Sequence, residues 1–225
     1  MALLGKAALA MWWDMAPAMR REFEHWHTHE HFPERLAIPG FRRASRWGDG
    51  GTGIFVLYEL EAHEVLGSPA YLARLNAPTP WSSKLMPHHA NMVRCQSRVL
   101  HSRGGAVAGH AITLRLSPQR GREEDLRQYL CARIDDLARR PGFAGAHLLQ
   151  TQAPAIGQTV EQRMRGGADA AADWIVLACG YDAQALGAAG AAELGDAALE
   201  EAGAAPGVQR AAHVLLLTMV PADVA

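Results

Sequence analysis

The chain has 225 residues, of which 49% are hydrophobic and 20% are charged, and a formal net charge of -1. This length is enough for one large domain or two small ones with an ample apolar core. The near-neutral charge, with no block of lysine or arginine, excludes the basic surface typical of nucleic-acid-binding proteins. The three cysteines are widely spaced and form neither a CxxC motif nor a zinc-type cluster, so we expect reduced thiols and a cytoplasmic protein.

The first apolar run of the chain, residues 7–13, has the position of a targeting segment. It is too short to span a membrane, and no small-residue cleavage site follows it. We therefore predict a β-strand there and no membrane partner.

Two parts of the sequence repeat a short pattern. Residues 38–41 (IPGF) recur as residues 140–143 (RPGF). Each copy follows a stretch with helical periodicity, and each helical stretch follows an apolar run that ends in proline. An ordered repeat of this kind indicates two similar structural units in one chain.

The remaining patterns complete each unit in the order β-α-β-β-α-β, which is the ferredoxin-like arrangement. Expected strands cover residues 7–17, 41–47, 54–60, 93–101, 108–118, 144–151, 174–181 and 213–220, and expected helices cover residues 20–37, 62–75, 126–137 and 183–204. One such unit leaves an apolar sheet face exposed, and two units can cover it. We predict an α+β protein of two tandem ferredoxin-like βαββαβ repeats, packed sheet-to-sheet as a single-chain dimeric α/β barrel.

The predicted boundary separates an N-terminal repeat, residues 1–103, from a mainly structural C-terminal repeat, residues 104–225. Pairing of two chains into a homodimer is left open. Residues 76–92 and 152–172 interrupt the repeat, and we expect loops at both. The first of these contains Trp81, His88 and His89, and its tryptophan offers a flat apolar surface for a ligand or a plug for the end of the barrel.

Residues 20–39 contain four histidines in alternate positions, His25, His27, His29 and His31. A helix advances about 100° per residue, so the first and third share one direction, and the second and fourth share roughly the opposite one. Glu30 falls on the apolar stripe of this helix. A carboxylate there must be paired, hydrogen-bonded or directed at a cavity, which makes Glu30 a candidate acid/base group, unless the helix ends before it.

The histidines allow several interpretations. A pair spaced by four residues could supply two metal ligands, with a third from His88 or His89, but nothing in the spacing requires this. Surface histidines are commoner, and a general acid/base role for His27 or His31 suits an imidazole pKa near about 6.5. We predict no metal site and no cofactor, and leave a haem or a divalent metal open.

The same segment resembles a known family. Its Trp26-His27, its His31-Phe32-Pro33, its Leu36 and its Pro39-Gly40 are similar to the aromatic-Trp, His-x-Pro and Leu-Pro-Gly signature of EthD-like proteins. Those proteins belong to the dimeric α/β barrel superfamily, which also includes small antibiotic-biosynthesis monooxygenases and cyclases. The resemblance implies a pocket between sheet and helices, with His31 as the matching motif residue.

Two positions depart from the family pattern, because His27 stands where the family has tryptophan and Ile38 replaces the usual leucine. The equivalent helix of the second half, within residues 122–143, keeps the Pro-Gly turn but has no histidine. If the motif carries function, only the first half does.

The two arginines at positions 94 and 98 share one face of an expected strand. Such a face is usually exposed or paired with acids such as Glu59 and Glu61, and an anionic ligand is the less favoured alternative.

These patterns favour a cofactor-independent enzyme that acts by acid/base chemistry on a hydrophobic, aromatic or polyketide-like small molecule, as a lyase, dehydratase or isomerase. The alternatives are a haem- or oxygen-dependent monooxygenase-like barrel and a non-catalytic binder of small molecules. The predicted site residues are catalytic His31, Glu30 and His27 and substrate-binding Trp26, Trp81, His88 and His89.

Overall fold

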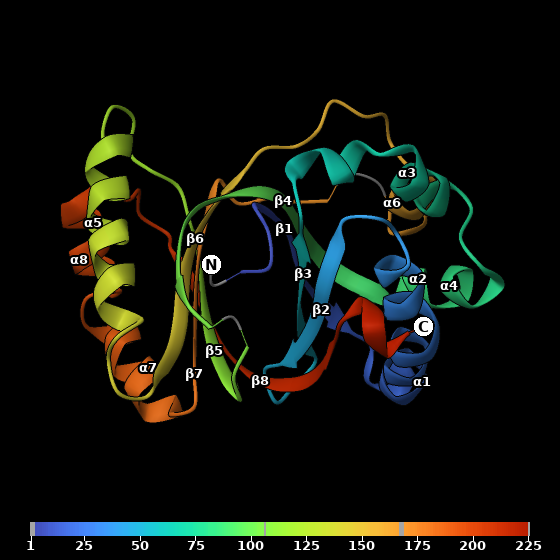
Figure 1. The fold of residues 1–225 in the computed structure, drawn as a ribbon, viewed down its shortest axis with the longest axis horizontal. Coiled ribbons are helices and arrows are strands. Elements are labelled where there is room, and N and C mark those ends of the chain that lie inside the picture. The colour runs from blue at the N-terminus through green and yellow to red at the C-terminus, as the bar shows by residue number, and fades with distance from the viewer. Residues whose placement is uncertain (1–2, 106, 167–168, 225) are drawn as a thin grey trace. The chain divides into compact units, whose positions relative to one another are not determined.

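The computed structural model describes residues 3–105, 107–166 and 169–224. The chain divides into two compact units, drawn together in Figure 1. The first unit contains Arg98–Thr151 and Ala172–Leu215, and the second contains Leu4–Ser97, Gln152–Ala171 and Leu216–Ala225. In the described part of the chain, no helix has the length and apolar character needed to cross a membrane.

The second unit is built on three antiparallel strands, β1 (Ala7–Met15), β2 (Phe41–Gly48) and β3 (Gly53–Leu60), in the order β1-β3-β2. In the register of this sheet, Leu9 lies opposite Tyr58 and Met11 lies opposite Val56. Because side chains alternate along a strand, these four residues share one face of the sheet.

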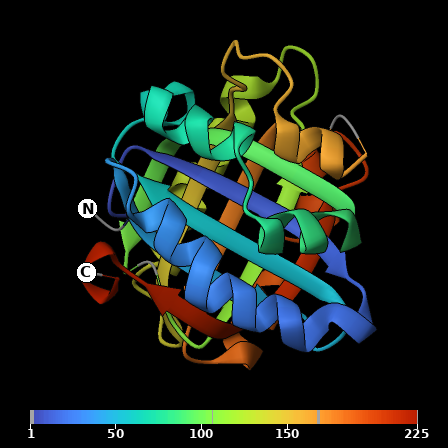
Figure 2. The same ribbon diagram turned by 90° about the vertical axis from the view of Figure 1, so that its right-hand side faces the viewer.

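Helices cover that face. Figure 2 shows the first of them lying over the strands of the same unit. They are α1 (Arg20–Trp26), a π-helical turn η2 (His27–His31), α2 (Phe32–Leu36), α3 (Pro69–Asn76), α4 (Pro80–Leu85) and α6 (Val160–Met164), with short 3-10 turns at η1 (Pro17–Met19), η3 (His63–Gly67), η4 (Met86–His88) and η5 (Pro221–Asp223). The fully buried rings of Phe23 and Trp26 in α1 and of Phe32 in α2 pack these two helices against the sheet.

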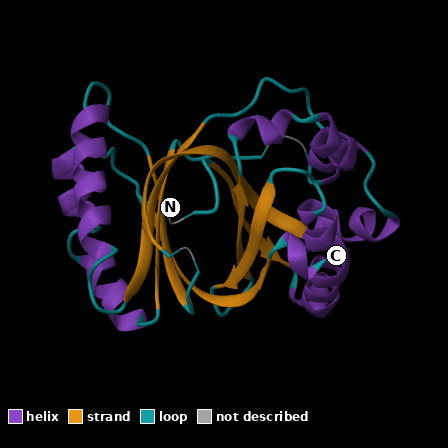
Figure 3. Cartoon of the chain, in the orientation of Figure 1, coloured by secondary structure: helices purple, strands orange, loops and turns teal. Residues whose placement is uncertain are grey.

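The first unit repeats the arrangement with β5 (His110–Leu116), β6 (Phe143–Thr151) and β7 (Trp174–Gly180), in the antiparallel order β5-β7-β6. Its helices are α5 (Glu123–Leu137), α7 (Ala183–Ala191) and α8 (Asp196–Ala202), coloured with the other helices in Figure 3. In α5, Leu126, Leu130, Ile134 and Leu137 are fully buried and recur every three or four residues, so one helical face packs on the sheet.

Two longer strands, β4 (His89–Gly104) and β8 (Gln209–Met219), have residues in both units. The hydrogen-bonded strand order, β1-β3-β2-β8-β5-β7-β6-β4, is that of a closed antiparallel barrel. The predicted fold class is therefore confirmed: this is an α+β chain with the βαββαβ order twice and the topology of a single-chain dimeric α/β barrel. The division after residue 103 stays a prediction.

Several expected segments differ in detail. Both segments expected as loops contain helices, because each has a threonine that caps a helix start: Thr79 accepts a hydrogen bond from the Ser82 backbone, and Thr159 forms a capping box with Gln162. The helix expected over residues 183–204 is two helices, α7 and α8, since the chain turns between them. The first expected helix is interrupted by the π-helical turn η2.

Candidate functional site

A cavity of about 30 Å³ lies inside the second unit, between the face of its sheet and the helices that cover it. Its sheet side consists of Leu9, Met11 and Trp13 from β1 and of Val56 and Tyr58 from β3. These residues have period-two spacing on paired strands, which is why they meet on one face. The wall formed by β1 and β3 is therefore apolar apart from the hydroxyl of Tyr58 and the indole N–H of Trp13.

The π-helical turn supplies two histidines to the helix side of the cavity. His27 and His31 are both buried, and their rings stack with centroids 5.3 Å apart and planes inclined by 21°. His25 and His29, which share the other direction along the helix, are exposed. A π-helical turn contains one residue more than an α-helical turn and is found frequently at functional sites. Here it widens the helix where the two buried imidazoles face the cavity.

A third imidazole comes from His89 at the beginning of β4. This ring is buried, and its Nδ1 lies 3.1 Å from the Leu85 carbonyl oxygen and 3.2 Å from the Met86 carbonyl oxygen. A carbonyl only accepts hydrogen bonds, so Nδ1 carries the proton. In the neutral ring, Nε2 is then the atom that can accept a proton.

All three cavity histidines are held in the neutral form. Burial lowers the pKa of His27 and of His31 well below 6.5, and the guanidinium groups of Arg46 and Arg35, respectively, act in the same direction. Burial lowers the pKa of His89 to about 4. At neutral pH the cavity therefore contains three uncharged imidazoles, which is the form that accepts a proton.

Several buried polar atoms in this cavity lack partners. Among the described residues, nothing forms a hydrogen bond with Nδ1 of His27, Nδ1 of His31 or the hydroxyl of Tyr58. Burial also raises the pKa of Tyr58, so its hydroxyl stays protonated and can donate. Buried polar groups are nearly always hydrogen-bonded, and a cluster of unpartnered groups around one cavity therefore indicates a binding site.

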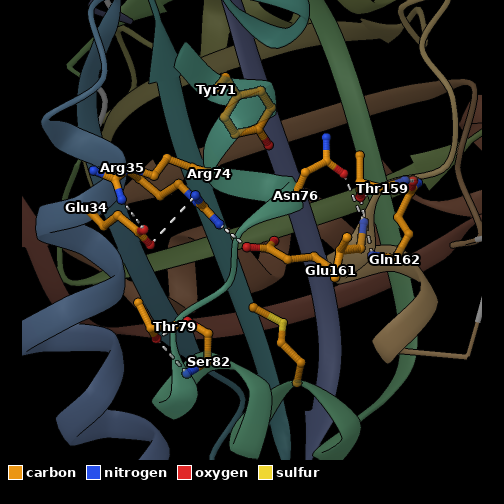
Figure 4. A network of polar contacts seen from close by, with 12 residues as sticks. Glu34, Arg35, Tyr71, Arg74, Asn76, Thr79, Ser82, Thr159, Glu161 and Gln162 are labelled. Carbon is orange, nitrogen blue, oxygen red and sulfur yellow. Dashed lines mark hydrogen bonds and ion pairs between the residues drawn. The ribbon is translucent and has the colours of Figure 1, made fainter. Parts of the chain in front are cut away.

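Charged side chains close the cavity from the α6 side. Arg35 pairs with Glu161, and both side chains are buried. Burial opposes the charge on Arg35, but the carboxylate of Glu161 and nearby groups outweigh it and raise the pKa of Arg35 above its usual range. Figure 4 shows these two residues together with Glu34 and Arg74, which extend the network along the helices. The network ties α6, inserted late in the sequence, to α2.

Two further arginines line the cavity. Arg165 pairs with Asp169 at 2.9 Å, and Arg94 donates a hydrogen bond of 2.9 Å to the hydroxyl of Tyr71. None of the ion pairs found within the described ranges involves Arg94. The sequence placed Arg94 on a strand, as observed. Its side chain is buried, however, and its hydrogen-bond partner is a tyrosine, not an acid.

Four of the seven predicted site residues line this cavity, namely Trp26, His27, His31 and His89. Trp81 does not line it: this residue is half-buried, with its indole nitrogen 3.3 Å from a Glu22 carboxylate oxygen and its ring beside His25. His88 is exposed.

Glu30 also lies outside the cavity wall. Its Oε1 accepts hydrogen bonds from Nε1 of Trp26 at 3.0 Å and from the hydroxyl of Thr79 at 2.5 Å. The carboxylate therefore fixes the ring of Trp26, which itself packs against His31 with ring centroids 4.4 Å apart. This contact makes Glu30 a positioning group for the cavity.

The contacts of Glu30 lead to a prediction. Glu30→Gln keeps one oxygen acceptor and should leave turnover close to wild type, whereas Glu30→Leu removes both hydrogen bonds and should destabilise the fold by about 1–3 kcal/mol. Chemical denaturation and steady-state kinetics on the two variants measure both effects. Loss of turnover in Glu30→Gln without loss of stability would show that this carboxylate takes part in the chemistry.

Sequence reasoning missed five lining residues with ionisable side chains, Arg35, Tyr58, Tyr71, Glu161 and Arg165. For the last two, a signal was available: Thr159-Val160-Glu161-Gln162 has the capping-box pattern that marks a helix start. The tyrosines and Arg35 carry no such signal, because their meeting depends on the tertiary structure.

Metal and cofactor binding can be tested against this geometry. Among the described residues, no group of three or more His, Cys, Asp or Glu side chains is arranged to hold a metal ion. Sites for molecules of drug size have volumes of about 300–1,000 Å³, so the cavity of about 30 Å³ must widen before a haem or a substrate of that size can enter.

The buried histidines predict a pH-dependent stability. A histidine whose pKa is lower in the folded state binds its proton more tightly when unfolded, so folding stability falls as pH decreases below about 6.5. For His89, the loss should continue to a pH of about 4, at about 1.4 kcal/mol per pH unit in the steepest part.

Urea unfolding between pH 7.5 and pH 4 measures this slope. His89→Gln should flatten it by about one proton, whereas His88→Gln, at the exposed neighbouring position, should leave it unchanged. Equal slopes for wild type and His89→Gln would show that His89 titrates alike in the folded and unfolded states.

Comparison with known proteins supports the fold. No protein-family model and no curated protein matches this sequence. Solved structures do match: an anthrone oxidase-like protein has a TM-score of 0.67 at 12% identity and covers 100% of this chain and 98% of its own. A proposed monooxygenase from Fusobacterium nucleatum has a TM-score of 0.63 at 9% identity, with coverage of 97% and 96%.

A third solved structure, a ferredoxin-fold protein from Listeria monocytogenes related to antibiotic biosynthesis monooxygenases, has a TM-score of 0.52 at 6% identity, with coverage of 94% and 96%. These structures have the dimeric α/β barrel fold of ferredoxin-like units, and at such low identity the likeness shows the fold alone. This chain is similar to them over its whole length.

Proposed function

We propose that the cavity of the second unit is the active site of a cofactor-independent enzyme that removes a proton from a hydrophobic, aromatic or polyketide-like small molecule. The observation that carries this proposal is the pair of buried, neutral imidazoles, His27 and His31, each with an unpartnered Nδ1 at one cavity. A neutral imidazole in an apolar site is a general base in the correct protonation state.

In this proposal His31 takes the proton and His27 supports it as the stacked neighbour. The negative charge that develops on the substrate oxygen is stabilised by the hydroxyl of Tyr58, which has no competing partner among the described residues. The protonated His31 then returns its proton to another atom of the substrate or to a leaving group. The outcome is an isomerisation in the first case and an elimination, as in a lyase or dehydratase, in the second.

Substrate entry requires the cavity wall to move, since about 30 Å³ holds only one or two water molecules. Three methionines in the wall, Met11, Met86 and Met92, have unbranched side chains that adapt to different shapes. Trp26 contributes a flat face for an aromatic ring. Trp81 and His88, which the sequence assigned to substrate binding, lie outside this wall.

A second candidate is oxygen chemistry, which the anthrone oxidase-like and monooxygenase-type proteins of similar fold favour. The first step is the same proton removal, after which the carbanion reacts with molecular oxygen in place of a proton. For an anthrone, loss of two hydrogens and gain of one oxygen atom from O2 gives the anthraquinone, and the second oxygen atom leaves as water. Absorbance of the purified protein in the visible range tests separately for a haem.

Both candidates can be tested with anthrone as the probe, because its central methylene group is weakly acidic. Under nitrogen in D2O, the enzyme should accelerate exchange of the methylene hydrogens, followed by NMR. Under air, enzyme-dependent formation of anthraquinone supports the oxygen reaction, and exchange alone supports the isomerase or lyase type. If neither anthrone nor a panel of aromatic ketones exchanges faster than the blank, the chain does not act by proton removal.

Three finer assignments belong to the same proposal. Membership of the EthD-like family rests on the motif around His31, and a cytoplasmic location rests on the reduced-cysteine pattern. Assembly into a homodimer also stays a prediction, which light scattering of the purified chain would test.

A further inference from the structure

Arg94 is a buried cation with a single side-chain partner. It is 8% exposed, lies on β4 and lines the same cavity as the three imidazoles. Its Nη2 donates to the hydroxyl of Tyr71, which is 1% exposed. A neutral phenol does not compensate a positive charge, and burying a guanidinium without a counter-charge is unfavourable.

The other charges around the cavity compensate one another. Arg35 pairs with Glu161, and Arg165 pairs with Asp169, so each of these two arginines has its own carboxylate. The cavity histidines are neutral and add no charge. Among the described residues lining the cavity, Arg94 is the arginine with no carboxylate within ion-pair distance. A ligand carboxylate would supply that missing counter-charge.

We propose that the substrate is a hydrophobic carboxylic acid, bound as its carboxylate by Arg94. This inference rests on the proposed function, since it names the substrate class of the same cavity. The planar guanidinium fork matches a carboxylate in geometry, and Tyr71 holds one arm of that fork in place. A carboxylate carries one negative charge, which matches the single charge of Arg94, whereas a phosphate monoester dianion carries two.

The other residues of the cavity wall determine which hydrophobic group the substrate can carry. Leu9, Val56 and Leu75 are aliphatic, and Trp13 and Trp26 are aromatic. These walls offer no charge to a second polar group, whereas they pack well against a ring system. The substrate is thus an aromatic or polyketide-like acid whose carboxylate lies at Arg94 and whose ring lies among the apolar residues.

The test compares 1-naphthoate with its neutral analogue 1-naphthamide and with dianionic 1-naphthyl phosphate, by calorimetry at pH 7. Wild type should bind the carboxylate about 10- to 100-fold more tightly than the amide, the range expected for charge-assisted hydrogen bonds. It should also bind the carboxylate more tightly than the phosphate. Arg94→Met should lose the preference over the amide.

Arg98→Met is the matched control, because Arg98 lies on the same strand but is exposed, and it should keep the full preference. Equal binding of acid and amide by wild type, absence of binding by both, or tighter binding of the phosphate would overturn the inference. So would an undiminished preference in Arg94→Met. If that variant fails to fold, the comparison of the three ligands on wild type still decides.

His31→Gln separates this inference from the proposed function. The variant should keep the preference for naphthoate, because Arg94 is intact, while losing the exchange activity. Retained exchange together with retained carboxylate preference would contradict the proton-removal mechanism and leave the carboxylate site standing. If wild type shows no carboxylate preference and His31→Gln loses the exchange activity, the carboxylate site is wrong and the proton-removal mechanism stands.

Discussion

Replacing His31 with glutamine should lower kcat/KM for proton removal by about 10²–10⁴-fold, the usual contribution of a positioned general base. Glutamine is polar and comparable in size, but it has no basic nitrogen. The ring of His31 packs against Trp26 and His27, and both contacts are largely retained by a side chain of similar volume. Most of the loss should therefore fall on kcat, with KM changed little.

His29→Gln is the control for this experiment, since His29 lies in the same π-helical turn and is exposed. It should match wild type in both kcat and KM. Hydrogen–deuterium exchange of the substrate, measured for wild type and both variants at pH 7, gives the rates directly. If His31→Gln exchanges the substrate hydrogens at the wild-type rate, the base is His27 or His89. The variants His27→Gln and His89→Gln then identify which of the two it is.

The pH profile of the same reaction carries independent information. Because burial lowers the pKa of His31 well below 6.5, the base stays unprotonated through the neutral range. The rate should therefore be flat around pH 7 and fall only in acid, below the range in which a solvent-exposed histidine titrates. A rate that halves near pH 6.5 would indicate a base that is in contact with water.

The fold was predictable from the sequence because its signals are local. The Pro-Gly-Phe turn occurs twice, each copy follows a helical pattern, and the apolar runs such as residues 54–60 and 174–181 are long enough for buried strands. The helical period also predicted that His27 and His31 point away from His25 and His29, but not which pair is buried.

The cavity itself was predictable only in part, because its wall brings together residues far apart in sequence. Strand pairing and a late insertion bring together Tyr58, Arg94 and Glu161. No spacing in the sequence predicts that these three residues line one cavity. For Glu30, the helical period placed a carboxylate on the apolar stripe, and its catalytic role stays a prediction. The π-helical turn and the hydroxyl of Thr79, however, give the carboxylate partners outside the cavity.

The chemistry of the site depends on how the protein distributes charge around an apolar space. Neutral imidazoles accept protons, and a fixed cation attracts an acid. In a site of low polarity, each interaction with a charge is stronger than in water. This arrangement requires the second unit to keep water out, and α6 contributes Glu161 to that closure from a segment inserted far along the chain. The pair formed by Arg35 and Glu161 joins α2 to α6 at this wall of the cavity.

Breaking that pair should cause the largest loss of stability among single substitutions in the site. Glu161→Leu leaves the buried guanidinium of Arg35 without its carboxylate, and removal of one partner from a buried ion pair destabilises proteins by about 3–5 kcal/mol. The double variant Arg35→Met with Glu161→Leu removes both charges and should recover most of that loss, because two apolar side chains of similar volume pack in place of the pair.

Urea unfolding of the wild type, both single variants and the double variant forms a double-mutant cycle that isolates the interaction. Glu22→Gln, which breaks the exposed contact with Lys84, is the control and should leave unfolding unchanged. A double variant as unstable as Glu161→Leu alone would mean that the two side chains act separately. In that case α6 is held by its other contacts, such as the hydrogen bond from the Val160 backbone to the Asn76 side chain, and the closure of the cavity does not depend on this ion pair.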